Sequence, residues 1–212
     1  IDENNIILAT ANGFRIFNVV KESYVKNILS ISSETPKDQY DNIKLDVNYF
    51  QLINKDNLWV SSFDGQVYKV NLLNETKENF SVKTNISNNG AQNLFYDSLN
   101  NLLWVNIENT GIDILDLKSN QVINLRDDNS SLSGKAFNNI IKDDQNNIWI
   151  SSATEGALKF DPGKRKFTPY LRNYPKNMSL TFGVVWGMTF DDDENLWIST
   201  REPGGGILKL DF

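Results

Sequence analysis

The sequence predicts an all-β protein, a β-propeller of four-stranded antiparallel blades, and two observations support this. A tryptophan recurs within the same short phrase four times, at Trp59, Trp104, Trp149 and Trp197, with intervals of 45, 45 and 48 residues. Around each tryptophan, short β-type runs alternate with turn residues, as an antiparallel blade requires. A repeat of about 45 residues with this content is typical of propeller blades.

The clearest repeat covers residues 137–170. Its β-type runs are residues 140–143, 148–152, 157–161 and 166–170. The same order of runs recurs at residues 50–53, 59–62, 66–71 and 80–83, and again at residues 94–97, 103–106, 111–116 and 122–125. The last unit has runs at 185–191, 196–200 and 206–211, and the first has runs at 6–10, 14–17 and 25–29. The sequence therefore predicts 18 strands in five units.

These strands amount to about 4.5 blades of four strands each. We expect one propeller domain, or a piece of one, over residues 1–212, with repeats centred on Ile7, Trp59, Trp104, Trp149 and Trp197. Two forms stay open: a five-bladed ring that lacks one strand at each end, or part of a larger ring. The incomplete end units, and a first residue that falls inside a repeat, favour a piece of a longer protein. An open arc of blades would leave strand edges unpaired, which is a route to association.

Composition excludes several classes of function. The 212 residues carry 21 Lys and Arg against 27 Asp and Glu, a net charge of −6 without a basic patch, so nucleic acid is not an expected partner. Cysteine and histidine are absent, which removes disulfides, thiolate chemistry, imidazole bases and the commonest zinc ligands. No run of about 18 apolar residues exists, so this segment is not expected to enter a membrane. We expect no catalytic residue, cofactor or metal.

The repeat phrases resemble a known family. Residues 192–200 read Asp-Asp-Glu-Asn-Leu-Trp-Ile-Ser-Thr, and residues 204–211 read Gly-Gly-Gly-Ile-Leu-Lys-Leu-Asp. This pattern resembles the two-component regulator propeller repeat, in which Gly-Asn-Leu-Trp-Ile-Gly-Thr is followed by a short loop and Gly-Gly-Leu. Residues 143–161 match it nearly as well, and the unit at Ile7 is degenerate. Two family glycines are replaced in both of these units, by Asn146 or Glu194 and by Ser151 or Ser199.

The resemblance implies a role as well as a fold. Such repeats typically form the periplasmic sensor region of Bacteroides-type hybrid two-component systems, where two seven-bladed propellers precede an immunoglobulin-like domain, a membrane helix and a kinase. The resemblance implies an oligosaccharide ligand, contacts with the other propeller and immunoglobulin-like domains of the same receptor, and a receptor homodimer. The chain itself would be non-catalytic.

Trp186 departs from the repeat and is the leading candidate for ligand binding. It lies at the start of a first strand, where the aligned positions hold Asn48, Asn138 and Gln92. An aromatic ring among amides can stack on a sugar ring while the amides bond to its hydroxyls. The alternative, an aromatic side chain packed beneath the insertion at residues 170–181, stays open.

The loops that follow the tryptophan strands add charged candidates, namely Arg201, Glu202 and Glu155. Such loops commonly open on the ligand-binding face of a propeller, and Arg201 can pair bidentately with a uronate or sulfate group. Solvated loop charges without a ligand are the plain alternative. Many acids are present, but no pair of carboxylates stands out. A carbohydrate-active enzyme using Asp and Glu, or a structural docking module, therefore remain the competing interpretations.

The four repeated tryptophans are predicted to be structural, because packing between blades requires the same large ring in every blade whereas a binding site does not. The series Asp191, Asp193 and Asn195 has the spacing of a calcium loop. An EF-hand, however, needs a glycine and then a helix where this sequence continues as a strand. We therefore interpret these side chains as turn residues.

Overall fold

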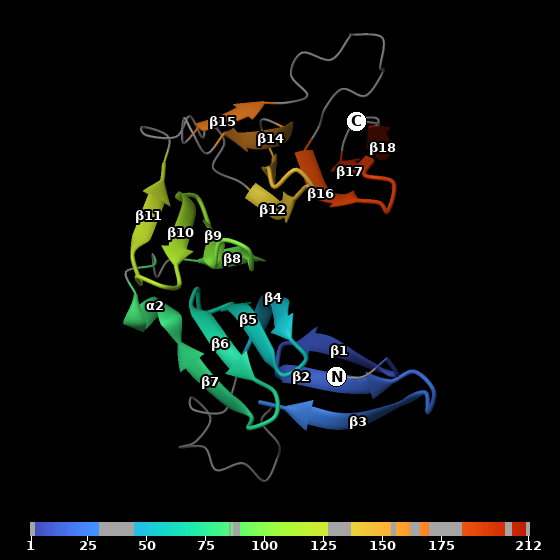
Figure 1. Ribbon diagram of the computed structural model, residues 1–212. Helices are drawn as coiled ribbons and strands as arrows, with labels where there is room; N and C mark the ends of the chain where they lie inside the picture. Colours follow the sequence, from blue (N-terminus) through green and yellow to red (C-terminus); the bar gives the residue numbers. More distant parts are fainter. Residues whose placement is uncertain are drawn as a thin grey trace. The chain divides into compact units, whose positions relative to one another are not determined.

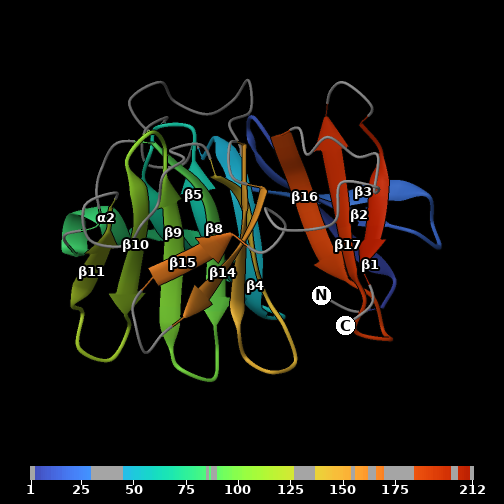
Figure 2. The same cartoon turned by 90° about the horizontal axis from the view of Figure 1, so that it is seen from above.

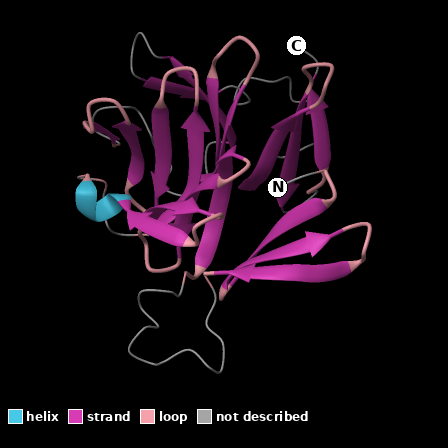
Figure 3. Ribbon diagram, turned by 60° about the horizontal axis from the view of Figure 1, so that its bottom comes forward, coloured by secondary structure: helices cyan, strands magenta, loops and turns pink. Residues whose placement is uncertain are grey.

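The computed structural model describes residues 3–29, 45–84, 86, 90–126, 137–153, 156–161, 166–169, 184–201 and 205–210. Within these residues the protein consists of five β-sheets, called blades 1 to 5, and one short helix, α2 (Phe80–Lys83) (Figure 3). No helix in this part of the chain is long and apolar enough to span a membrane.

In every blade, strands that are consecutive in the chain are hydrogen-bonded neighbours (Figure 1). Blade 1 contains β1 (Asn5–Thr10), β2 (Gly13–Asn18) and β3 (Ser23–Ile28). Blade 2 contains β4 (Val47–Asn54), β5 (Asn57–Ser62), β6 (Val67–Asn71) and β7 (Thr76–Asn79). Blade 3 contains β8 (Ala91–Asp97), β9 (Leu102–Ile107), β10 (Gly111–Asp116) and β11 (Val122–Leu125).

Blades 4 and 5 follow the same plan, with antiparallel pairing throughout. Blade 4 contains β12 (Phe137–Lys142), β13 (Ile148–Ser152), β14 (Gly156–Asp161) and β15 (Lys166–Pro169). Blade 5 contains β16 (Val184–Phe190), β17 (Leu196–Arg201) and β18 (Ile207–Leu210). The prediction of an all-β, propeller-type protein is confirmed, and the residues that the structure describes contain 18 strands in these five blades.

The chain divides into two compact units. Unit 1 consists of Ile1–Leu103 and Leu115–Val122, and unit 2 consists of Trp104–Ile114 and Ile123–Phe212. Blades 1 and 2 belong to unit 1 and blades 4 and 5 to unit 2, while the division passes through blade 3. Whether all five blades form one propeller over residues 1–212 stays a prediction.

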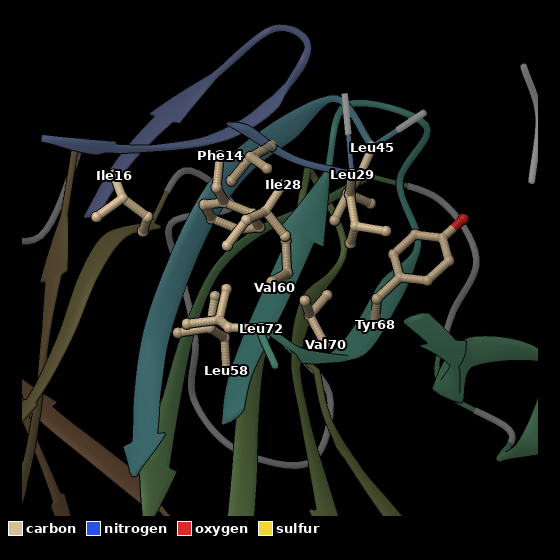
Figure 4. Close-up of a cluster of buried hydrophobic side chains, with 11 residues drawn as sticks. Phe14, Ile16, Ile28, Leu29, Leu45, Leu58, Val60, Tyr68, Val70 and Leu72 are labelled. Carbon is tan, nitrogen blue, oxygen red and sulfur yellow. The ribbon is translucent and has the colours of Figure 1, made fainter. Parts of the chain in front are cut away.

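The core of unit 1 fills the space between blades 1 and 2, and Figure 4 shows its side chains. Its buried members are Phe14, Ile16, Ile28, Leu29, Leu45, Val47, Leu58, Val60, Tyr68, Val70 and Leu72. The rings of Phe14 and Phe50 meet edge to face across the two sheets, with centroids 5.4 Å apart. On β2, β5 and β6 every second side chain points to this core, and the apolar residues of these strands therefore recur with a period of two.

Blade 1 depends on a glycine where it meets the chain that leads into blade 2. The amide of Gly13 donates to the carbonyl of Leu45 at 2.8 Å, and Gly13 has a φ of 79°. A Cβ atom at this position would lie 2.2 Å from the carbonyl oxygen of Leu29. Only glycine combines this backbone conformation with the absence of a side chain.

The core of unit 2 lies between blades 4 and 5. Trp149 on β13 is fully buried among side chains of blade 5 and its own blade, with Ala157, Val185, Met188, Leu196, Ile198 and Leu210 as the other buried members. On β17 the core-facing residues Leu196 and Ile198 alternate with Trp197, which points to the opposite side of the sheet. Each blade of this unit therefore has one tryptophan side and one aliphatic side.

The fourth strand of blade 2 differs from the prediction. The sequence predicts a strand at residues 80–83, but the strand is β7, just before them, and residues 80–83 form α2. The helical turn lets the buried ring of Phe80 meet Trp59 edge to face at 4.7 Å, and Thr84 caps the turn by donating to the carbonyl of Phe80. An outermost strand is largely solvated, so the polar sequence of β7 lacks the apolar alternation that marks the other strands.

Candidate functional site

Three first strands carry a β-bulge near their start, and these bulges define the position at which Trp186 lies. The pairing register shifts around Trp186 in β16, around Asn138 in β12 and around Asn48 in β4. The three residues are thus structurally equivalent, as the alignment of the repeats predicts. A bulge redirects its side chain out of the regular alternation, and bulges are frequent beside functional sites.

The two asparagines at this position use their amides to join consecutive blades. Nδ2 of Asn138 donates to the carbonyl of Val185 at 2.7 Å, directly before Trp186. Nδ2 of Asn48 donates to the side-chain Oε1 of Gln92 at 3.2 Å and to its carbonyl at 3.3 Å. Asn138 therefore helps to hold the backbone of the Trp186 bulge, while contact of either asparagine with a ligand stays a prediction.

Trp186 and Arg201 are brought together on blade 5. The Trp186 side chain is 52% exposed, and Cζ of Arg201 lies 5.6 Å from the centre of its ring. A guanidinium held against an aromatic ring keeps its N–H donors in its own plane, directed away from the ring. The pair thus offers an aromatic surface beside a cation with several hydrogen-bond donors.

A shallow groove lies on the side of blade 5 that carries Arg201. Trp197, Ser199 and Arg201 alternate along β17 and so point to one side of the sheet, which we call the Trp197 face. Figure 2 shows β16, β17 and β18 side by side. The groove has a volume of about 430 Å³ and is lined by Asn139, Gly187, Met188, Thr189, Trp197, Ile198, Ser199 and Ile207. Aromatic, aliphatic and hydroxyl groups are therefore close together here.

Three of the four repeated tryptophans are buried, as their structural interpretation requires: Trp59, Trp104 and Trp149 are 2%, 3% and 0% exposed. In unit 2 each of the buried rings meets an aromatic ring of the following blade. Trp104 lies 5.1 Å from Phe160 and Trp149 lies 6.4 Å from Phe190, both edge to face. Trp197 is the exception, because its ring is partly exposed on the Trp197 face.

The Asp191 series organises a turn. The indole Nε1 of Trp197 donates to Oδ2 of Asp191 at 2.7 Å, and the amide of Asn195 donates to its Oδ1 at 2.8 Å. These hydrogen bonds lower the pKa of Asp191 from 3.8 to about 2, and the bond from the Trp197 indole has the largest effect. Asp143 receives the same bond from Trp149 at 2.8 Å. The described residues contain no group of three or more acidic side chains placed to hold a metal ion.

Sequence reasoning missed the lysines that cover the tryptophans. Nζ of Lys69, Lys159 and Lys209 lies 6.0, 5.1 and 5.6 Å from the ring centres of Trp59, Trp149 and Trp197, respectively. Each lysine is the direct cross-strand neighbour of its tryptophan. A lysine ten residues after the tryptophan in blades 2 and 4 was the available signal, because a short hairpin brings these positions face to face.

Two predicted site residues, Glu155 and Glu202, lie outside the described residues. The other four divide by unit: Asn48 lies in unit 1, whereas Asn138, Trp186 and Arg201 lie in unit 2. Within unit 2 the structure joins Trp186 with Arg201 directly and with Asn138 through the carbonyl of Val185.

No model of a protein family matches the sequence, and no curated protein matches it. Solved structures do resemble it. The extracellular domain assigned to the hybrid two-component system BT3049 of B. thetaiotaomicron has a TM-score of 0.70 and 21% identity, over 98% of this chain and 26% of that one. The extracellular domain assigned to BT4673 of the same organism has a TM-score of 0.69 and 17% identity, over 100% of this chain and 30% of that one.

The WD40 β-propeller domain of Doa1 is also similar, with a TM-score of 0.63 and 10% identity over 94% of this chain and 58% of that one. These likenesses establish the propeller-type fold. Two of these similar structures are extracellular domains assigned to two-component systems of B. thetaiotaomicron, in agreement with the resemblance drawn from the repeats. The chain spans between a quarter and a third of the length of those two structures.

Proposed function

We propose that this chain is a ligand-recognising propeller segment of the periplasmic sensor of a hybrid two-component receptor, and that its ligand is an oligosaccharide. The observation that carries the proposal is the pair of Trp186 and Arg201 on blade 5. Trp186 occupies a position at which blades 2 and 4 hold asparagine. About half of Trp186 is exposed, and the Arg201 guanidinium lies beside it. The extracellular domains of two-component systems that share this fold support the same role.

The chemistry of the pair suits a sugar. The face of the indole can stack on the apolar C–H face of a pyranose ring, while the Arg201 donors bond to ring hydroxyls or to an acidic substituent. Asn138 acts as a positioning residue, since it anchors the carbonyl directly before Trp186. Residues Glu155, Glu202 and Asn48 remain further candidates for contacts with the ligand.

Signalling follows from differential binding. A ligand that binds one arrangement of the receptor dimer more tightly than another shifts the population toward it, and the change reaches the kinase through the neighbouring propeller and immunoglobulin-like domains. The chain needs no catalytic residue or cofactor for this role. A docking module is the second candidate function, and the groove on the Trp197 face favours it because apolar side chains there are partly exposed.

The test is calorimetric titration of the protein against a panel of plant and host oligosaccharides, with each mixture then analysed for cleavage products by chromatography. The proposal expects binding without cleavage, loss of binding in Trp186→Ala, and weakening in Arg201→Gln. Tyr24→Ala is the matched control, because Tyr24 is an aromatic residue of similar exposure, 57%, on blade 1. Cleavage of a glycan would favour the enzyme, and binding that survives Trp186→Ala would remove the site from blade 5.

A further inference from the structure

We propose that unit 1 has a carbohydrate contact of its own, formed by the exposed ring of Phe63 and the amides of Asn48 and Gln92, and that it takes an uncharged pyranose ring. We call these three side chains the Phe63 site. Phe63 lies in the loop that joins β5 to β6, and Gln92 lies at the start of β8, so that the whole site belongs to unit 1. The inference rests on the proposed function for the nature of the ligand, but it does not depend on Trp186 or Arg201.

Phe63 is the most exposed aromatic residue among those that the structure describes, at 69%, and its backbone is firmly held. The amide of Phe63 donates to the carbonyl of Asp46 at 3.0 Å, and the hydroxyl of Ser62 donates to the same carbonyl at 2.6 Å. After the ring, the amide of Gly65 donates to the carbonyl of Ser62 at 2.8 Å, and the amide of Ala91 donates to the carbonyl of Gly65 at 3.2 Å. The loop therefore keeps an apolar residue in place at the surface, which reduces the entropy lost when a ligand binds to it.

Phe63 occupies in blade 2 the position that Arg201 occupies in blade 5. Each lies four residues after the repeated tryptophan of its blade, and in both blades the preceding residue pairs with the residue directly before the bulge. In blade 5 the side chains at the loop and bulge positions, Arg201 and Trp186, are in contact. The same two positions in blade 2 hold Phe63 and Asn48. The backbone therefore places an aromatic ring beside an amide here, with the aromatic and polar positions exchanged relative to blade 5.

The two amides of the Phe63 site are held together on the side of blade 2 that faces β8. Nδ2 of Asn48 donates to Oε1 of Gln92 at 3.2 Å, and the hydroxyl of Ser61 donates to the carbonyl of Gln92 at 2.7 Å. Ser61 and Phe63 are two residues apart, and the bond from the Phe63 amide to Asp46 continues the strand pairing, so both side chains lie on this side. Amide groups both donate and accept hydrogen bonds, as sugar hydroxyls do. The ring and the amides therefore form one small surface with an apolar and a polar part.

The surroundings of the ring favour an uncharged sugar over an acidic sugar or a protein. Asp64 follows Phe63 in the loop and is exposed, with its carboxylate held by the Gln66 amide at 2.9 Å and the Tyr68 hydroxyl at 2.8 Å. This negative charge beside the ring disfavours uronate and sulfate groups. A stable protein interface needs roughly 1,000 Å² of surface, whereas Phe63 is followed by Asp64, Gly65 and Gln66 rather than by further apolar side chains. A pyranose ring has a small apolar C–H face bordered by hydroxyls, which matches one aromatic ring beside two amides.

The experiment is calorimetric titration of the 212-residue protein with four uncharged hexasaccharides: cellohexaose, xylohexaose, mannohexaose and maltohexaose. The wild type is expected to bind at least one of them, and Phe63→Ala to weaken that binding at least about tenfold. Phe63→Tyr keeps the aromatic ring and should stay within about threefold of the wild type. Tyr24→Ala is the matched control, because Tyr24 is a 57% exposed aromatic residue of the same unit that lies outside the Phe63 site. Circular dichroism checks that each variant is folded.

Three results would overturn the Phe63 site: a wild type that binds none of the four hexasaccharides, a Phe63→Ala variant that binds as tightly as the wild type, or a Phe63→Tyr variant that loses as much affinity as Phe63→Ala. Trp186→Ala, titrated in parallel, separates this inference from the proposed function. Loss of binding in Trp186→Ala with full binding in Phe63→Ala removes the Phe63 site and leaves the proposed site on blade 5 in place. The opposite pattern supports the Phe63 site and removes the site on blade 5. A wild type that binds only acidic oligosaccharides likewise overturns the Phe63 site alone.

Discussion

Replacing Trp149 or Trp197 by alanine separates the packing role of these residues from their polar contacts. Both indoles donate to an aspartate of the preceding turn, at 2.8 and 2.7 Å, and both carry a lysine over the ring, at 5.1 and 5.6 Å. The two rings differ in burial: Trp149 is fully buried against blade 5, whereas Trp197 is partly exposed. The pair of variants therefore compares two tryptophans whose polar contacts are matched.

Truncation of a buried tryptophan to alanine costs about 3–5 kcal/mol. Trp149→Ala should fall at the upper end, about 4–5 kcal/mol, because it also removes a hydrogen bond to a charged group. Trp197→Ala loses the same hydrogen bond but less buried area, so about 2 kcal/mol is expected. Urea unfolding followed by far-UV circular dichroism measures the loss of unfolding free energy in each variant, provided that the m-values agree with that of the wild type. Equal losses for the two variants would refute the packing argument.

Two further predictions concern polar groups. Asp191 has a folded-state pKa of about 2, below its ordinary 3.8, so its contribution to stability is present above about pH 4 and is lost as the pH falls toward 2. The urea midpoints of the wild type and Asp191→Asn should therefore converge over that range, and a constant difference would contradict the assigned bond from Trp197. Ser61 and Ser151 each lie two residues after a repeated tryptophan, and both are buried. The Ser61 hydroxyl donates a hydrogen bond to the carbonyl of Gln92 at 2.7 Å, whereas the Ser151 hydroxyl has no hydrogen-bond partner among the described residues. Ser61→Ala should lower the free energy of unfolding by about 1 kcal/mol, and Ser151→Ala should leave it unchanged or raise it. Thermal unfolding of the two variants tests this, and a larger loss of stability in Ser151→Ala than in Ser61→Ala would contradict it.

The fold could be predicted largely from the sequence because the residues that recur in its repeats have clear physical roles. The recurring tryptophan marks the second strand, and aspartate and asparagine mark the turn before it in blades 4 and 5. The fourth strand of blade 2 was missed because β7 is polar, whereas the more apolar run after it bends into a helical turn to bury Phe80. Edge strands carry the least information of this kind.

The candidate site could be predicted only in part. Trp186 stands out in an alignment of the repeats, but its contact with Arg201 depends on the bulge in β16. That bulge is a property of the strand pairing and leaves no local sequence signal. The exposure of Trp197 could not be read from the sequence either, since its phrase, Asn-Leu-Trp-Ile, differs from the Asn-Ile-Trp-Ile of the buried Trp149 only in the aliphatic residue before the tryptophan. Burial depends on what lies across the face of a blade, and periodicity does not specify this.

The central claim is that Trp186 binds ligand while the repeated tryptophans are structural. The protein has five tryptophans, so its ¹H–¹⁵N correlation spectrum should contain five indole N–H signals, which single Trp→Phe variants assign. The spectrum would be recorded during titration with the oligosaccharide that binds in the calorimetric panel. The account predicts that the Trp186 signal moves with saturating ligand while those of the buried Trp59, Trp104 and Trp149 stay in place. An unmoved Trp186 signal, with binding confirmed in the same sample, would contradict it.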